Sequence, residues 1–154
     1  MSVLYVIDSD VLITFERTQP RDIYTSLWDR FEALLRDGEA VVPREALTEL
    51  ERGTDDLAAW VKKTGAVLDA DDAVIAVVAQ ISTRYPGWVR LAKNAADPFI
   101  IATAKVLGAV VVTNEHSRNS ATLDVNLRIP QVAAEFGVTV VATNDLFRQL
   151  GWRF

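Results

Sequence analysis

Hydrophobic residues follow two alternating patterns along the chain. Unbroken apolar runs rich in β-branched residues predict strands that are covered on both faces, as in a parallel sheet. These runs lie at 3–7, 40–42, 109–113 and 138–141. Between them, apolar residues recur every three or four positions, which predicts helices. We expect helices after Asp10, over 23–36, after Pro43, over 57–61, over 71–81, after Pro98, and from Asn144 or Asp145. The alternation predicts an α/β fold.

Acidic residues stand where these elements begin or end. Asp8 directly follows the first apolar run, and Glu115 follows the run at 109–113. Glu49 lies on the helix after Pro43, and Asp97 precedes Pro98. Ligands of open α/β sheets collect at the carboxyl ends of strands, so we expect these four acids to meet there.

A purely structural interpretation of two acids stays open. Asp is a favoured helix N-cap, and for Asp10 we favour that role over a place in the site. Asp97 is equally well explained as the cap of a helix that has Pro98 as its first residue.

Composition limits the classes of protein. The chain has 154 residues, half of them hydrophobic, which predicts a single domain over residues 1–154. Cysteine is absent, which excludes disulfides and thiolate zinc sites. We find no membrane span or signal peptide and expect a cytoplasmic protein without a membrane partner. A net charge of −5 argues against non-specific coating of nucleic acid but allows a local basic rim.

Clustered carboxylates favour a hard divalent cation. Their mutual repulsion requires a positive charge, and Mg²⁺ or Mn²⁺ prefers oxygen ligands. Such ions activate water for phosphodiester cleavage without a histidine base. We therefore leave His116, the only histidine, out of the site.

Four segments resemble the successive motifs of PIN-domain ribonucleases. They are Ile7-Asp8-Ser9-Asp10-Val11-Leu12, Val42-Pro43 with Glu49-Leu50, Ala96-Asp97-Pro98 continuing to Ala104, and Val111-Val112-Thr113-Asn114-Glu115. The resemblance extends from Tyr5 to about Val140. It is strongest to the VapC-like toxins, within a PIN-like group that has Glu where most members have Asp after the threonine.

The resemblance implies a three-layer α/β/α PIN-like fold with a mostly parallel central sheet. It implies a Mg²⁺- or Mn²⁺-dependent endoribonuclease, the toxin of a type II toxin–antitoxin pair. The catalytic and metal-binding residues would be Asp8, Glu49, Asp97 and Glu115, supported by Ser9, Asp10, Thr113 and Asn114. Glu115 has one more methylene than Asp, so it is expected to hold the ion through water. Ser117 and Arg118 stand where family members often have a further acid.

The expected partners are RNA, a cognate antitoxin and a second copy of the chain. Single-stranded RNA is favoured because its unstacked bases can enter a cleft. Basic residues that flank the acidic motifs are candidates for phosphate contacts: Arg17, Arg21, Arg90, Lys93, Arg118 and Arg128.

Four tryptophans are expected to pack in the core rather than stack on bases: Trp28, Trp60, Trp88 and Trp152. The 71–81 helix is apolar on nearly every face, so we expect the 57–61 helix to cover part of it and a partner the rest.

Three alternatives compete with the nuclease. In a haloacid-dehalogenase-like phosphatase, Asp8 and Asp10 would be nucleophile and general acid, but the partnering lysine would have to be Lys105. A receiver-like phosphoacceptor needs a still later lysine, and none follows Lys105. A non-catalytic PIN-like binding module stays open, since fold does not dictate function.

Overall fold

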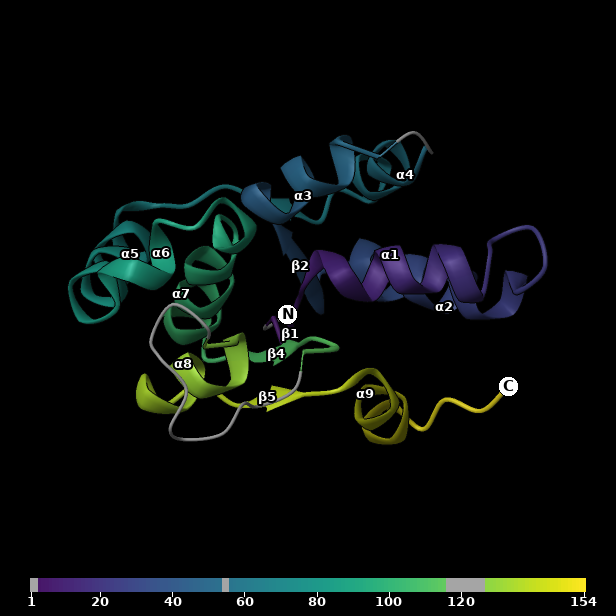
Figure 1. Cartoon of the computed structure of the whole chain (residues 1–154). Helices are drawn as coiled ribbons and strands as arrows, with labels where there is room; N and C mark the ends of the chain where they lie inside the picture. Colours follow the sequence, from purple (N-terminus) through teal and green to yellow (C-terminus); the bar gives the residue numbers. More distant parts are fainter. Residues whose placement is uncertain (1–2, 54–55, 116–126) are drawn as a thin grey trace.

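Five short parallel strands form the centre of the fold (Figure 1). The computed structural model describes residues 3–53, 56–115 and 127–154. Within them the strands lie in the order β3-β2-β1-β4-β5. Their bounds are β1 Tyr5–Ile7, β2 Ala40–Pro43, β3 Val67–Leu68, β4 Val110–Val112 and β5 Val140–Val141.

The central position of β1 explains its unbroken apolar sequence. Tyr5 lies opposite Ala40 of β2 on one side and Val110 of β4 on the other. Val6 and Ile7 have no exposed surface. A strand with neighbouring strands on both edges and helices on both faces has no side that contacts water. Its sequence therefore lacks the alternation of apolar and polar residues that is typical of half-exposed strands.

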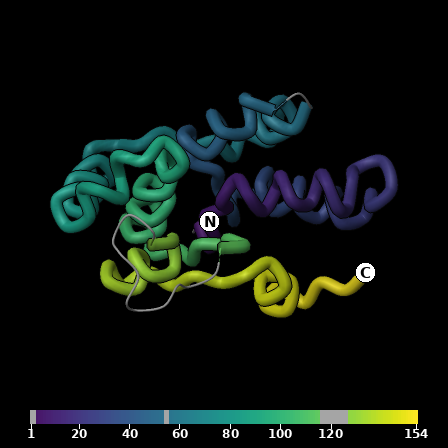
Figure 2. The backbone as a smooth tube through the Cα atoms, in the orientation of Figure 1, coloured from purple at the N-terminus to yellow at the C-terminus, as the bar shows by residue number. Residues whose placement is uncertain are grey.

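Helices cover both faces of the sheet. In Figures 1 and 2, α1, α2 and α9 lie on one side, and α5 to α8 lie on the other. The helices are α1 Ser9–Thr18, α2 Thr25–Arg36, α3 Arg44–Glu51, α4 Leu57–Thr64, α5 Asp72–Arg84, α6 Pro86–Val89, α7 Asp97–Leu107, α8 Ile129–Glu135 and α9 Thr143–Leu150, with a 3₁₀ turn at Ala92–Asn94. This arrangement confirms the predicted three-layer α/β/α class with a parallel central sheet.

The topology determines where a ligand site can form. The chain passes from β1 to β2 on one side of β1, and later returns to place β4 on the other side. The connections therefore diverge between the carboxyl ends of β1 and β4, which is where open α/β sheets commonly bind ligands. Asp8 and Thr113 are the first residues beyond these two strand ends.

The tryptophans pack as expected. Trp28 and Trp88 are buried, and Trp60 and Trp152 are partly buried against the core. Trp60 meets Trp28 edge-on, with ring centroids 5.0 Å apart. These rings therefore stabilise the packing of the helices on the sheet. None of the helices in the described ranges has the length and apolarity needed to span a membrane.

The helix starts differ from those predicted. Asp8, not Asp10, occupies the N-cap position of α1, and its side chain makes no capping hydrogen bond. Helix α7 begins at Asp97 itself, with Ala96 at the N-cap position. The capping interpretation is therefore wrong for both Asp10 and Asp97. Helix α9 begins at Thr143, slightly earlier than predicted.

Three short elements were not predicted, namely β3, α6 and α8. Strand β3 has only two half-buried residues at a sheet edge, and α6 has only four residues. Segments this short show no measurable periodicity.

The predicted partner of α5 was also wrong. Helix α5 packs mainly against α7 and α6, whereas α4 packs against α3 (Figure 1). Val74, Val77 and Ile81 form the buried face of α5, while Ile75 remains 52% exposed.

Candidate active site

A hydrogen bond between side chains joins the carboxyl ends of β1 and β4. The Thr113 hydroxyl donates to Asp8 Oδ2 over 2.7 Å, and the Asp8 backbone N–H donates to Val112 O over 3.0 Å. Both side chains are buried. Asp8 therefore lies between the carboxyl ends of β1 and β4, where the strand order favours a ligand site.

Asp10 belongs to the same cluster. Its Oδ1 accepts from the Asn114 backbone N–H at 3.3 Å, and its Oδ2 lies 3.4 Å from Thr113 Oγ1. The side chain therefore turns toward the end of β4 instead of capping α1. Sequence analysis gave Asp10 only a supporting role; its spacing of two residues from Asp8 at a helix start was the available signal.

Glu49 and Asp97 approach from helices on different sides. Glu49 comes from α3, and the nearby Ser9 hydroxyl partly offsets the rise that burial causes in the pKa of its carboxyl group. Asp97, only 6% exposed, is the first residue of α7. The charge of Glu49 raises the pKa of Asp97, so the two carboxylates act on each other.

Glu115 has a structural contact in addition to its place in the cluster. Its Oε2 accepts from the backbone N–H of Ile129, the first residue of α8, over 2.9 Å. Its backbone N–H donates to Thr113 Oγ1 over 3.1 Å. Glu115 thus links the end of β4 to the start of α8, where a carboxylate is favoured by the helix dipole.

Burial and mutual repulsion raise the pKa values of acids in this cluster. Burial, followed by the charges of Glu115 and Glu49, raises the pKa of Asp97 to about 8. Burial, followed by the charges of Asp10 and Asp97, also raises the pKa of Asp8 well above its ordinary value. Burial similarly raises the pKa of Asp10 and Glu49. A bound cation would relieve this repulsion.

The donor set fits a hard divalent ion in its chemistry. All the side chains that converge here offer carboxylate, hydroxyl or amide oxygens, which Mg²⁺ and Mn²⁺ prefer. Across the parts of the chain that the structure describes, no three acidic or histidine side chains are already positioned to hold one ion. Mg²⁺ commonly binds through one or two carboxylates and several waters, so a direct set of three is not required.

The predicted basic residues lie in different settings. The positive charge of Arg128 lowers the pKa of Asp97, so Arg128 lies at the edge of the acidic cluster. Arg17, Arg90 and Lys93 are exposed. Arg118 lies outside the described residues, as do Ser117 and His116.

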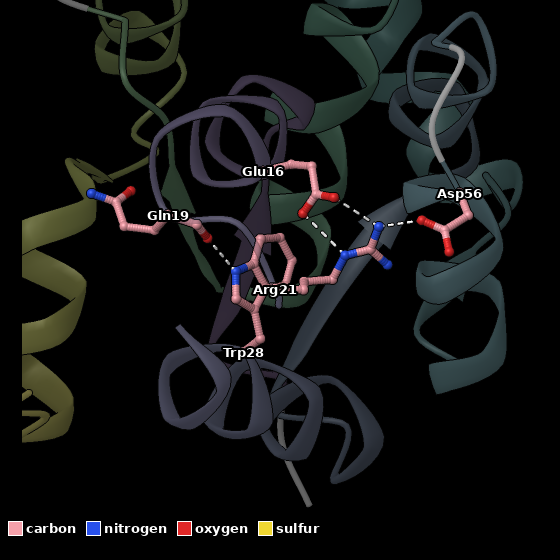
Figure 3. Close-up of polar contacts among 5 residues, drawn as sticks. All are labelled: Glu16, Gln19, Arg21, Trp28 and Asp56. Carbon is pink, nitrogen blue, oxygen red and sulfur yellow. Dashed lines mark hydrogen bonds and ion pairs between the residues drawn. The ribbon is translucent and has the colours of Figure 1, made fainter. Parts of the chain in front are cut away.

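Arg21 is already engaged in the protein. Figure 3 shows its guanidinium between the carboxylates of Glu16 and Asp56. Its Nη2 lies 2.8 Å from Glu16 Oε1, and its guanidinium carbon lies 5.7 Å from the centroid of the Trp28 ring. These contacts join the end of α1 to the start of α4, so the position of Arg21 favours a structural role over phosphate binding.

The lysine required by the phosphatase alternative is not beside Asp8. Lys105 Nζ donates to the carbonyl of Phe136 over 2.9 Å. Phe136 precedes β5, so this contact lies toward the amino ends of the strands, away from the acids. This placement argues against phosphoryl transfer to Asp8.

The chain belongs to the DUF4411 family. The model of this family, described as "Domain of unknown function (DUF4411)", matches residues 5–154. No curated protein matches the chain.

Solved structures are similar to it in fold. The crystal structure of PAE2754 from Pyrobaculum aerophilum is 15% identical, with a TM-score of 0.54 and coverage of 98% of both chains. That of FitAcB from Neisseria gonorrhoeae is 20% identical, with a TM-score of 0.53 and coverage of 89% of this chain and 96% of that one. The fold is accordingly the PIN-like three-layer α/β/α fold.

Proposed function

We propose that this protein is a Mg²⁺- or Mn²⁺-dependent endoribonuclease. The observation that carries the proposal is the convergence of Asp8, Asp10, Glu49, Asp97 and Glu115 at the carboxyl ends of β1 and β4. Burying so many like charges together is costly unless a cation is part of the functional state.

Each polar side chain has a distinct role in the proposal. Asp8, Glu49 and Asp97 would hold the ion, with Glu115 contacting it through water. The hydroxyl of Thr113 orients the carboxylate of Asp8. The Ser9 hydroxyl lies near Glu49 and lowers the pKa of its carboxyl group. When bound, the ion would supply an activated water and stabilise charge on the phosphodiester oxygens.

RNA as the substrate rests on the resemblance to PIN-domain ribonucleases and on the basic residues. The charge of Arg128 acts on Asp97, and Arg17, Arg90 and Lys93 have exposed side chains that can contact phosphates. An acidic centre with a basic edge suits a polyanion whose scissile phosphate is bridged by a metal.

The resemblance to VapC-like toxins also motivates an antitoxin partner and a homodimer. The exposed Ile75 and the partly buried Val78 on α5 offer an apolar surface for the dimer. We expect light scattering to show a dimer at micromolar concentration and Val78→Glu to weaken it. A wild-type protein that is strictly monomeric would contradict this part of the proposal. A small adjacent reading frame that encodes an inhibitor would support the antitoxin.

RNA cleavage tests the proposal. The purified protein should cut single-stranded RNA with Mg²⁺ or Mn²⁺, stop with EDTA, and lose cleavage in Asp97→Asn. Asp69→Asn, an exposed acid paired with Arg44, is the matched control and should cleave normally. Cleavage that survives full chelation, or wild-type protein that cuts no RNA with either ion, would overturn the proposal.

A further inference from the structure

A pocket that no charged side chain of the described residues lines adjoins the acidic cluster. It has a volume of about 390 Å³ and lies between α1, the end of β4 and the start of α9. Its polar lining comes from Thr14, Thr18, Gln19, Asn114, Thr143 and Asn144. Its size falls in the range of small-ligand sites.

Asn114 forms the wall between this pocket and the acids. Its backbone N–H donates to Asp10, so the residue is attached to the cluster. Its side-chain Oδ1 accepts from the Thr143 hydroxyl over 2.7 Å. This bond fixes the orientation of the amide. Among the described residues, none accepts a hydrogen bond from Nδ2, which remains a donor for a ligand.

The chemistry of the lining selects a neutral ligand. A phosphate would find no cation among the lining residues and would lie close to Asp10, which accepts a hydrogen bond from the Asn114 backbone N–H. Hydroxyls and amides instead suit a neutral ring that presents donors and acceptors, with Phe15 contributing apolar surface. The bases of single-stranded RNA are ligands of this kind.

We propose that this pocket binds the base of a nucleotide next to the scissile phosphate and thereby selects the sequence that is cut. The inference rests on the proposed function. Thr143 is a positioning residue, because it acts through the amide of Asn114. Asn144, which is exposed, contacts the base from the rim.

Two matched threonine variants test the pocket. Thr143→Val removes the hydroxyl that holds Asn114 and keeps the side-chain volume. Thr83→Val removes a hydroxyl from a different surface pocket, on α5. Asn144→Ala is a second pocket variant at an exposed position with little effect on folding. The readouts are kcat/KM for short RNAs that differ in one base beside the cut, and the affinity for uncleavable 2′-O-methyl tetranucleotides of each base.

The expected result is a loss of base discrimination in the pocket variants. Thr143→Val and Asn144→Ala should each reduce the preference among bases about fivefold, the effect of one hydrogen bond, and Thr83→Val should not change it. If the wild type cuts RNA with a base preference that both pocket variants retain, the pocket is not the selecting site and the nuclease proposal stands. If the wild type cuts no RNA but binds tetranucleotides with a preference that Thr143→Val removes, the nuclease proposal fails and the pocket stands. If it neither cuts nor binds, both fail.

Discussion

Acids in two regions of this molecule have opposite environments. On the surface, Asp56 is bonded to Arg21, and Asp69 lies 2.8 Å from Arg44 Nε. These arginines lower the pKa of both acids. At the carboxyl end of the sheet, burial and neighbouring carboxylates raise the pKa of Asp8 and Asp97.

This difference in pKa reflects the partners of the two groups of acids. The surface acids Asp56 and Asp69 pair with arginines, whereas Asp8 and Asp97 lie among other carboxylates. Among the described residues, no ion pair includes Asp8, Asp10, Glu49 or Asp97. Arginines and lysines instead pair with acids elsewhere in the protein. These pairs contribute little to the free energy of unfolding, because they lie at or near the surface. We therefore expect the cluster to destabilise the fold when no cation is bound, as is common at functional sites.

Removing single charges should have the largest effect and tests the difference between the clustered acids and the surface acids most sharply. Asp8→Asn and Asp97→Asn should each lower kcat/KM for RNA by about 10²-fold or more, because each removes a carboxylate proposed to hold the ion. Asp69→Asn removes a surface charge of the same kind and should have no effect. Initial-rate measurements with Mn²⁺ check the three variants side by side. If Asp97→Asn cleaves RNA at the wild-type rate, Asp97 does not hold the ion and serves only as the first residue of α7.

Divalent ions should stabilise the protein through the cluster. An ion that binds the folded site and not the unfolded chain adds about 2.7 kcal/mol at 100 times its Kd. For a domain of this size, that corresponds to a rise in Tm of about 5–10 °C. Thermal melting with and without Mn²⁺ measures it. A Tm that does not respond to millimolar Mg²⁺ or Mn²⁺ would contradict the account.

The metal-free protein should lose stability as the pH rises. The pKa of Asp97, about 8 in the folded chain, lies above the value of about 3.9 for an unfolded Asp. The folded state therefore holds this proton more tightly, and its stabilising effect, complete below about pH 4, is lost as the pH rises to 8. Urea unfolding in EDTA at pH 5.5, 7 and 8.5 should show this decline, and Asp97→Asn should flatten it. If the free energy of unfolding declines with pH equally in the wild type and in Asp97→Asn, groups other than Asp97 cause the pH dependence.

Glu115→Gln should have the smallest effect of these changes. The amide oxygen can still accept the hydrogen bond from the Ile129 N–H, so the start of α8 should stay in place. If Glu115 contacts the ion through water, cleavage should fall only about tenfold, as for outer-shell groups. The rate relative to that of Asp8→Asn is the measurement. Equal losses would indicate direct ligation by Glu115.

The buried strands were predictable because their environment leaves a clear pattern. Tyr5–Ile7 and Val110–Val112 are apolar throughout, since helices cover both faces of the sheet. The α/β class follows from the alternation of such runs with helical segments, whereas the three-layer arrangement was predicted from the resemblance to PIN-domain ribonucleases.

The role of Asp10 was harder to predict because local propensity competes with tertiary contacts. Intrinsic preference assigns an Asp at this point to a helix cap. The contacts of Asp10 with Thr113 and Asn114 arise only when β4 pairs beside β1. The four proposed catalytic acids were predicted from their places at strand ends and helix starts and from the motif resemblance, whereas the link between Glu115 and Ile129 left no signal in the sequence.

Direct titration of Mn²⁺ into the metal-free protein tests the central claim, that these acids form a cation site. Electron paramagnetic resonance reports free Mn²⁺, so binding appears as loss of that signal. The account predicts saturable loss with the wild type and Asp69→Asn, and little or none with Asp97→Asn. Equal binding by wild type and Asp97→Asn, or no binding by the wild type at millimolar Mn²⁺, would contradict it.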